Sequence, residues 1–129
     1  MTEVRRISPV LVVDAVDPCA QFWERLGFAR TAVVPHEDTI GFAILAKDGL
    51  EVMYQSVASV RADLSGSAES LAAGGGCLYV EVADLEGAIR AVDGAPVVVP
   101  RRTTPYGMEE YGVKEPGGHV IIFAKATPG

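Results

Sequence analysis

The chain has 129 residues, of which 49% are hydrophobic, and a formal net charge of −6. This length fits one compact unit or two small halves that share a core. The acidic balance argues against a nucleic-acid partner, because a phosphate-binding surface needs clustered Lys and Arg. We interpret the short pairs Arg5-Arg6 and Arg101-Arg102 as solvated strand ends. The apolar run Val10 to Val13 is too short for a membrane span or a signal peptide, so we expect a cytoplasmic protein with no membrane partner.

The first half of the chain predicts a strand, a helix and three more strands. The first strand is expected over Ile7 to Val13. Asp17 is a good N-cap and Pro18 suits the first helical position, and apolar residues recur at helical spacing up to a stop at Gly27. The later strands are expected over Ala29–Val34, Ile40–Ala46 and Leu50–Gln55.

The second half repeats this order of elements. A strand is expected from Cys77 to Val82, followed by a helix that Asp84 caps and that ends at Gly94. The later strands are expected over Pro96–Arg102, Glu109–Lys114 and His119–Lys125. Residues 57–76 are rich in Gly, Ala and Ser, and are predicted to link modules at about 5–56 and 77–126 within one domain spanning 1–129.

An offset of 69 residues aligns the two halves. It lays Phe42 on Tyr111, Ile44 on Val113, and the turn Lys47-Asp48-Gly49 on Pro116-Gly117-Gly118. We interpret this as an internal duplication. The predicted fold class is α+β, with two tandem βαβββ modules that form curved mixed sheets around a cleft and carry their helices on the outer faces.

Strand alternation predicts which side chains face away from the helices. Leu50, Val52 and Tyr54 are expected to pack on the first helix. Glu51, Met53 and Gln55 then face the opposite side, as Cys77, Tyr79 and Glu81 do in the second half. A ligand would bind on this concave side. The predicted ligand-binding residues are Glu51, Met53, Gln55, Tyr79, Glu81, Tyr106, Met108, Glu110 and Ile122.

Three segments resemble the vicinal oxygen chelate superfamily, which includes glyoxalase I, extradiol dioxygenases and bleomycin-resistance proteins. They are SPVLVVDAVDPCAQFWERLGF, LYVEVADLEGAI and TPYGMEEYGVKEPGGHVIIFA. The last segment is most similar to the bleomycin-resistance branch, whose members bind a ligand in a cleft without a metal. The resemblance also implies a homodimer.

The enzymes of this superfamily hold a divalent metal at four positions, which the resemblance places at Ser8, Met53, Cys77 and Ile122. A hydroxyl, a thioether, a thiol and an alkyl group are a poor donor set for such an ion. We therefore expect no metal and no other cofactor. A different register of the last strand in the first half would bring Glu51 into the set.

Two functions follow as hypotheses. The first is a metal-free protein that binds a small, partly aromatic or cationic molecule and sequesters an antibiotic or metabolite. The alternative is a metal-dependent lyase, isomerase or dioxygenase that uses Glu51 and unconventional ligands. A scaffold protein without a ligand is a third possibility.

Four further residues are given structural interpretations. His36 is expected on an exposed hairpin loop, and no partner base can be named for His119. Cys77 is expected to be a small buried hydrophobe, and Trp23 to pack in the core or in a dimer interface rather than to stack on a ligand.

Overall fold

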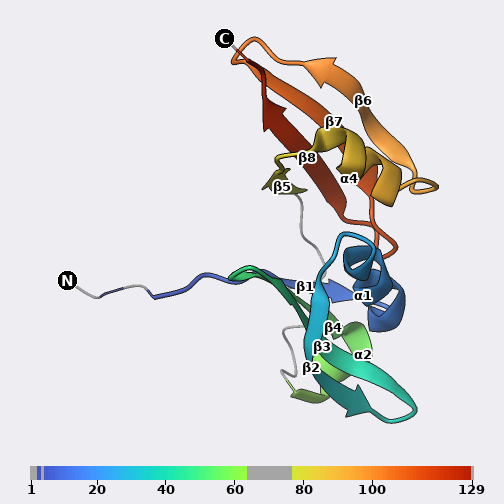
Figure 1. Ribbon diagram of the computed structural model, residues 1–129. Coiled ribbons are helices and arrows are strands. Elements are labelled where there is room, and N and C mark those ends of the chain that lie inside the picture. Colours follow the sequence, from blue (N-terminus) through green and yellow to red (C-terminus); the bar gives the residue numbers. More distant parts are fainter. Residues whose placement is uncertain (1–2, 4, 64–76, 129) are drawn as a thin grey trace. The chain divides into compact units, whose positions relative to one another are not determined.

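The computed structural model describes residues 3, 5–63 and 77–128. The chain divides into two compact units, Met1–Gly74 and Gly75–Gly129. Each unit contains one four-stranded mixed sheet, so the predicted α+β fold with two βαβββ modules is confirmed (Figure 1). The cleft expected between the two sheets stays a prediction.

The first unit has the strand order β1-β4-β3-β2. Strand β1 runs parallel to β4, and the other neighbours are antiparallel. Its elements are β1 (Val10–Val13), α1 (Val16–Glu24), β2 (Ala29–His36), β3 (Thr39–Lys47), β4 (Leu50–Ser56) and α2 (Val57–Asp63).

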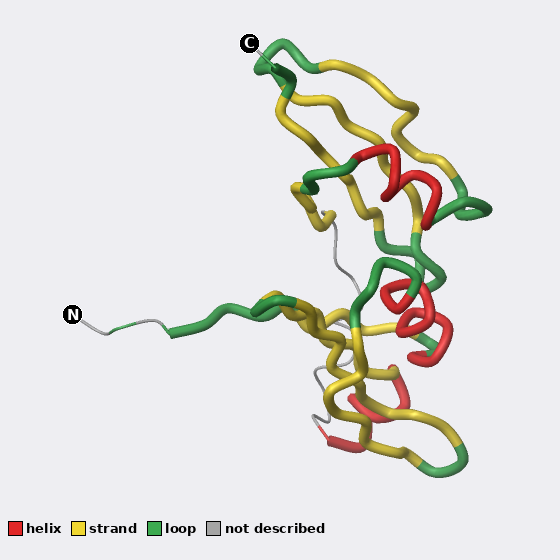
Figure 2. Tube along the Cα trace, viewed as in Figure 1, coloured by secondary structure: helices red, strands yellow, loops and turns green. Residues whose placement is uncertain are grey.

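The second unit has the corresponding order β5-β8-β7-β6, again with one parallel pair, β5 and β8. Figure 2 shows its strands and its helix along the trace. Its elements are β5 (Cys77–Glu81), α4 (Leu85–Ala91), β6 (Val97–Thr103), β7 (Met108–Lys114) and β8 (Val120–Ala126).

Alternating side chains form the core of each unit on one face of its sheet. In the first unit Val52 and Tyr54 are buried on the face that α1 covers, and Trp23 Nε1 donates a hydrogen bond of 2.9 Å to Tyr54 Oη. Trp23 therefore packs in the core, as predicted. In the second unit Ile121 and Phe123 are fully buried. Leu50, expected to pack with Val52 and Tyr54, is exposed because it lies at the turn where β4 begins.

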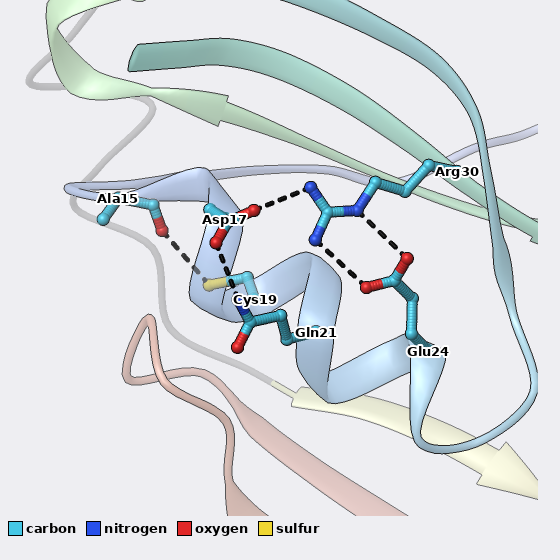
Figure 3. A network of polar contacts seen from close by, with 6 residues as sticks. All are labelled: Ala15, Asp17, Cys19, Gln21, Glu24 and Arg30. Carbon is cyan, nitrogen blue, oxygen red and sulfur yellow. Dashed lines mark hydrogen bonds and ion pairs between the residues drawn. The ribbon is translucent and has the colours of Figure 1, made fainter.

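The start of the chain differs from the sequence prediction in two respects. The first strand begins at Val10 rather than Ile7. Helix α1 begins at Val16, so Asp17 is in the first turn and Ala15 is the N-cap, with no side-chain cap. Asp17 and Glu24 instead bind the Arg30 guanidinium at 2.7 and 3.0 Å, which ties β2 to α1 (Figure 3). The hydrogen bonds to Glu24 and then Asp17 raise the pKa of Arg30.

Helix α4 begins as the sequence predicts. Asp84 is its N-cap, and its Oδ1 accepts a hydrogen bond of 3.0 Å from the Gly87 amide. Gly27 and Gly94 follow the two module helices with φ of +91° and +95°, a conformation that glycine adopts without a steric cost.

Helix α2 was not predicted, because residues 57–76 were interpreted as a linker without secondary structure. Residues 57–63 form this helix, and residues 64–76 lie outside the described part of the chain. Val60 is fully buried against Val12 of β1. Val12 lies beside Gln55 and therefore on the face opposite Tyr54. Helix α2 thus covers part of the face that α1 leaves open.

The loops of the two repeated hairpins differ in length by one residue, which the offset of 69 did not reveal. The β3–β4 hairpin has a two-residue loop, Asp48-Gly49. In the β7–β8 hairpin Glu115 N donates to His119 O, which leaves a three-residue loop over 116–118. Ile44 pairs with Met53, whereas Gly112, not Val113, pairs with Ile122. A one-residue change of register moves every side chain of a strand to the other face.

Candidate functional site

The open face of each sheet, opposite α1 or α4, contains the residues that the sequence analysis proposed for ligand binding. In the first unit Glu51, Met53 and Gln55 are half-buried on one face of β4. In the second unit Tyr79 and Glu81 are exposed on β5, and Ile122 is half-buried on β8. Met108 and Glu110 lie on the same face, opposite Ala126 and Ala124 of β8. Whether the two sets share a single site stays a prediction.

A pocket of about 520 Å³ lies on the open face of the first unit. Phe42 lies on β3, the middle of the three strands, and pairs with Val34 on one side and Gln55 on the other. Helix α2 contributes Ser59 and Ala62. The full lining is Val34, Pro35, His36, Phe42, Gln55, Ser59 and Ala62.

Hydrogen bonds hold the polar part of this pocket in place. Gln55 Nε2 donates to Ser59 Oγ at 3.1 Å. The Ser59 amide donates to Ser56 Oγ at 3.1 Å, which caps the start of α2. His36 is the last residue of β2 and lines the pocket, so its prediction as a loop residue was wrong. The two-residue turn at 37–38 leaves His36 paired with Thr39.

Gly41 permits the close approach of β2 and α2 at the pocket. A Cβ at this position would lie 2.6 Å from His36 Cβ and 3.2 Å from Ser59 Cβ. Any other residue here would push one of these elements away. The pocket geometry therefore depends on a glycine that sequence periodicity alone does not single out.

Ser8 and Glu51 meet at the other end of the same face. Ser8 Oγ donates to Glu51 Oε2 at 2.7 Å, and Arg6 Nη1 lies 3.5 Å from the same oxygen. The parallel register, which pairs Val10 with Met53, therefore brings Glu51 and not Met53 to Ser8. The carboxylate already has a hydroxyl donor and a cation as partners.

A cluster of four polar residues, here called the Glu110 cluster, occupies the open face of the second unit. It consists of Glu110, Tyr79, Tyr106 and Arg102. Glu110 is only 1% exposed. Its Oε2 accepts from Tyr79 Oη at 2.6 Å and from Tyr106 Oη at 2.9 Å. Its Oε1 accepts from Arg102 Nε and Nη2 at 3.0 and 2.9 Å.

These contacts keep Glu110 charged and Tyr79 neutral. The hydrogen bond from Tyr79 lowers the pKa of Glu110 most, and the bonds from Arg102 and Tyr106 add to this against the opposing effect of burial. The same bond to Glu110 is the main cause that raises the pKa of Tyr79. Tyr79 thus stays a hydrogen-bond donor well into the alkaline range.

The metal positions implied by the resemblance do not provide a fitting donor set. Ser8 Oγ is bonded to Glu51, Ile122 has only alkyl carbons, and Cys77 is exposed rather than buried as predicted. In the described ranges, no three His, Cys, Asp or Glu side chains gather in a group that could hold a metal ion. Glu51 adds one carboxylate, which the nearby Arg6 competes for. A divalent transition metal needs about three N, O or S donors.

His119 has the acidic neighbour that the sequence analysis could not name. Glu115 Oε1 accepts from the His119 amide at 2.7 Å and lies 3.4 Å from His119 Nδ1. Both residues flank the 116–118 loop, so the contact fixes the base of this hairpin.

Sequence reasoning missed Arg102, which was interpreted as part of a solvated strand end. Arg102 pairs directly with Glu110 across β6 and β7, and opposite charges at such positions are a known stabilising pair. The preceding residue, Arg101, binds Glu86 and Glu109 instead. Ser59 and Ala62 were missed because α2 was not predicted.

No protein-family model and no curated protein matches the sequence. Among the described residues, no helix is long and apolar enough to cross a membrane.

Solved structures share the fold over nearly the whole chain. TioX from Micromonospora sp. ML1 has 24% identity and a TM-score of 0.69, over 95% of this chain and 99% of that chain. A glyoxalase/bleomycin resistance protein/dioxygenase from Nocardioides has 15% identity and a TM-score of 0.71, over 100% and 88%. A glyoxalase/bleomycin resistance protein/dioxygenase family enzyme from Burkholderia phytofirmans PsJN has 14% identity and a TM-score of 0.70, over 92% and 96%. The fold that the resemblance to the vicinal oxygen chelate superfamily implies is thus confirmed.

Proposed function

We propose that the protein binds a small, partly aromatic organic molecule without a metal ion. The pocket between β2, β3, β4 and α2 is the observation on which this proposal rests. Its volume of about 520 Å³ lies within the range of about 300–1,000 Å³ that is usual for small-molecule sites.

The lining of the pocket indicates the chemistry of the ligand. Phe42, Val34 and Pro35 offer an apolar wall on which a ring can pack. Gln55, Ser59 and His36 offer hydrogen-bond donors and acceptors. Such a lining favours a ring system with one or two polar substituents.

The carboxylates of the open faces favour a neutral ligand over a strongly basic one. Glu51 is paired with Arg6 and Ser8, and Glu110 with Arg102 and two tyrosines. Their charges are therefore compensated within the protein. Glu81 is exposed and lies on β5, in the unit that does not contain the pocket.

Sequestration of an antibiotic or metabolite is the role we propose for this binding. Two of the structural neighbours are described as glyoxalase/bleomycin resistance proteins/dioxygenases, which supports a small-molecule ligand as a class. The alternative, a metal-dependent reaction, would need a donor set that Ser8, Glu51 and Cys77 do not complete. We further propose that the protein forms a homodimer in the cytoplasm.

An NMR titration with 2-naphthol, a neutral bicyclic ring with one hydroxyl, tests the pocket. We expect saturable shifts of the amides in β2, β3, β4 and α2. Ala62→Phe would fill the pocket and weaken binding at least about tenfold, because the 2-naphthol ring would lose its contact area with the lining. Arg61→Phe places the same side chain one residue away, at a position that does not line the pocket, and should leave binding unchanged.

Two results would contradict the proposal. One is the absence of saturable shifts with 2-naphthol. The other is equal weakening by Ala62→Phe and Arg61→Phe, with thermal melts showing that both variants are folded.

A further inference from the structure

Tyr79 crosses a neighbouring strand to reach its hydrogen-bond partner. It stands on β5, whereas Glu110 stands on β7, and β8 lies between them in the sheet. Its hydroxyl nevertheless lies 2.6 Å from Glu110 Oε2.

This bond determines how the Tyr79 ring lies. Adjacent strands are about 4.8 Å apart, so β5 and β7 are separated by roughly 10 Å. A tyrosine that spans this distance has to extend along the sheet rather than stand upright on it. The β8 residues beside Tyr79 and Glu110 are Ile122 and the small, fully buried Ala124. The Tyr79 side chain therefore extends across β8, and it keeps an exposed fraction of 48%.

The Glu110 cluster fixes this ring in place. Glu110 binds both tyrosine hydroxyls through one oxygen, and Tyr106 is 68% exposed. Because both phenols are already held by the buried carboxylate, a ligand that stacks on them would immobilise few additional rotors. Such preorganisation favours binding.

Arg102 provides a polar group beside the rings. Its Nε and Nη2 are bonded to Glu110 Oε1, and among the described residues Nη1 makes no hydrogen bond. Its side chain is 58% exposed. The free edge of this guanidinium can donate to a carboxylate or a carbonyl of a bound molecule.

We propose that the Glu110 cluster is a second binding site, which takes a planar aromatic carboxylate or carbonyl compound. The ring of the ligand stacks on Tyr79, next to Tyr106, and its acceptor oxygen binds Arg102 Nη1. The site lies entirely in the second unit, so it does not depend on the pocket in the first unit.

The probe is 2-naphthoate, with 2-naphthylmethylammonium as a probe of opposite charge and cyclohexanecarboxylate as a saturated one. An NMR titration of the full chain should give saturable shifts in β5, β7 and β8 with 2-naphthoate. We expect the two comparison compounds to bind at least about tenfold more weakly, because one repels Arg102 and the other cannot stack.

Substitutions at Tyr79 separate stacking from anchoring. Tyr79→Leu removes the ring and should weaken 2-naphthoate binding about tenfold or more. Tyr79→Phe keeps the ring and loses only the hydroxyl, so a smaller loss of about threefold is expected from its greater mobility. Thermal melts check that both variants are folded.

Three outcomes would overturn this inference. They are no saturable shift in the second unit, equal affinity for the saturated acid, and unchanged binding by Tyr79→Leu. If 2-naphthoate shifts only the amides of β2, β3, β4 and α2, the second site is refuted while the pocket of the first unit stands. If 2-naphthol does not bind the pocket of the first unit and 2-naphthoate binds the Glu110 cluster, the pocket is refuted and the second site stands.

Discussion

The two units have the same strand order and differ on the open faces of their sheets. Tyr54 and Phe123 occupy corresponding positions on β4 and β8, and both are fully buried on the helix side. On the open side, the first unit has a pocket beside α2, whereas the second has the Glu110 cluster.

One residue in a hairpin loop explains much of this difference. Phe42 lies opposite Gln55, and Glu110 lies opposite Ala124, which corresponds to Gln55 in the repeat. The same place in the sheet thus holds an aromatic ring in one unit and a carboxylate in the other. The helix-facing pattern maintains the fold, while the open face is free to change its chemistry.

Among the changes that test this difference between the units, deletion of Gly117 should have the largest effect on folding. A two-residue loop like Asp48-Gly49 would move β7 by one position, which would place Glu110 on the helix side of the sheet. A charged group buried without its partners is strongly destabilising, so we expect the second unit not to fold. Hydrogen exchange of the β7 and β8 amides is the measurement.

Gly117→Ser provides the matched control for this deletion. It keeps the loop length, and the residue with positive φ in this loop is Gly118. We expect near-normal protection. Retained protection of β7 in the deletion variant would show that the register does not depend on the loop.

The helix caps give a second, smaller contrast between the units. Asp84→Ala removes the hydrogen bond to the Gly87 amide and should lower the free energy of unfolding by about 1 kcal/mol. Ala15→Ser places a capping hydroxyl at the extended N-cap of α1, which has none, and should raise it by up to about 1 kcal/mol. Urea denaturation measures both, and the comparison fails if the two changes have the same sign.

The last and most specific prediction concerns the titration of Tyr79. In Glu110→Gln the carboxylate that raises the pKa of Tyr79 is gone, so Tyr79 should ionise closer to the ordinary value of 10.0. Because the folded-state pKa of Tyr79 is raised, its contribution to stability is present below pH 10 and is lost as the pH rises further. The pKa of Glu110 is lowered, so its contribution is present above about pH 4.5 and is lost in acid.

Tyrosine absorbance at 295 nm and NMR of the Tyr79 ring follow this titration. Glu109→Gln is the control, since Glu109 is the neighbouring residue on β7 and contacts Arg101 instead. An identical Tyr79 titration in the wild type and Glu110→Gln would contradict the assignment of this hydrogen bond.

The sequence was sufficient to predict the fold because periodicity records the helix-facing core. Val52, Tyr54 and Ile121 alternate with less buried residues in the way that a half-covered sheet requires. Asp84 was predictable as a cap because its chemistry is local.

The site was less predictable because its contacts depend on tertiary geometry. Tyr79 and Glu110 were both proposed for the open face, but their bond across β8 depends on the register of two non-adjacent strands. The register of β7 against β8 differs from that of β3 against β4 because the 116–118 loop has one extra residue. A single repeat offset does not reveal such an insertion. Helix α2 has little amphipathic pattern of its own and is held by Val60 against Val12.

The most direct test of metal-free ligand binding is the affinity of the chelator-treated protein for 2-naphthol. It is compared with samples that then receive Mn²⁺, Fe²⁺, Co²⁺, Ni²⁺ or Zn²⁺ singly at about 100 µM. The melting temperature is measured in the same samples, because a bound metal would raise it by mass action. We predict the same affinity and the same melting temperature in every sample. Binding that requires one of these metals, together with a rise in melting temperature that Glu51→Gln abolishes, would contradict this and establish a metal-dependent site at Ser8 and Glu51.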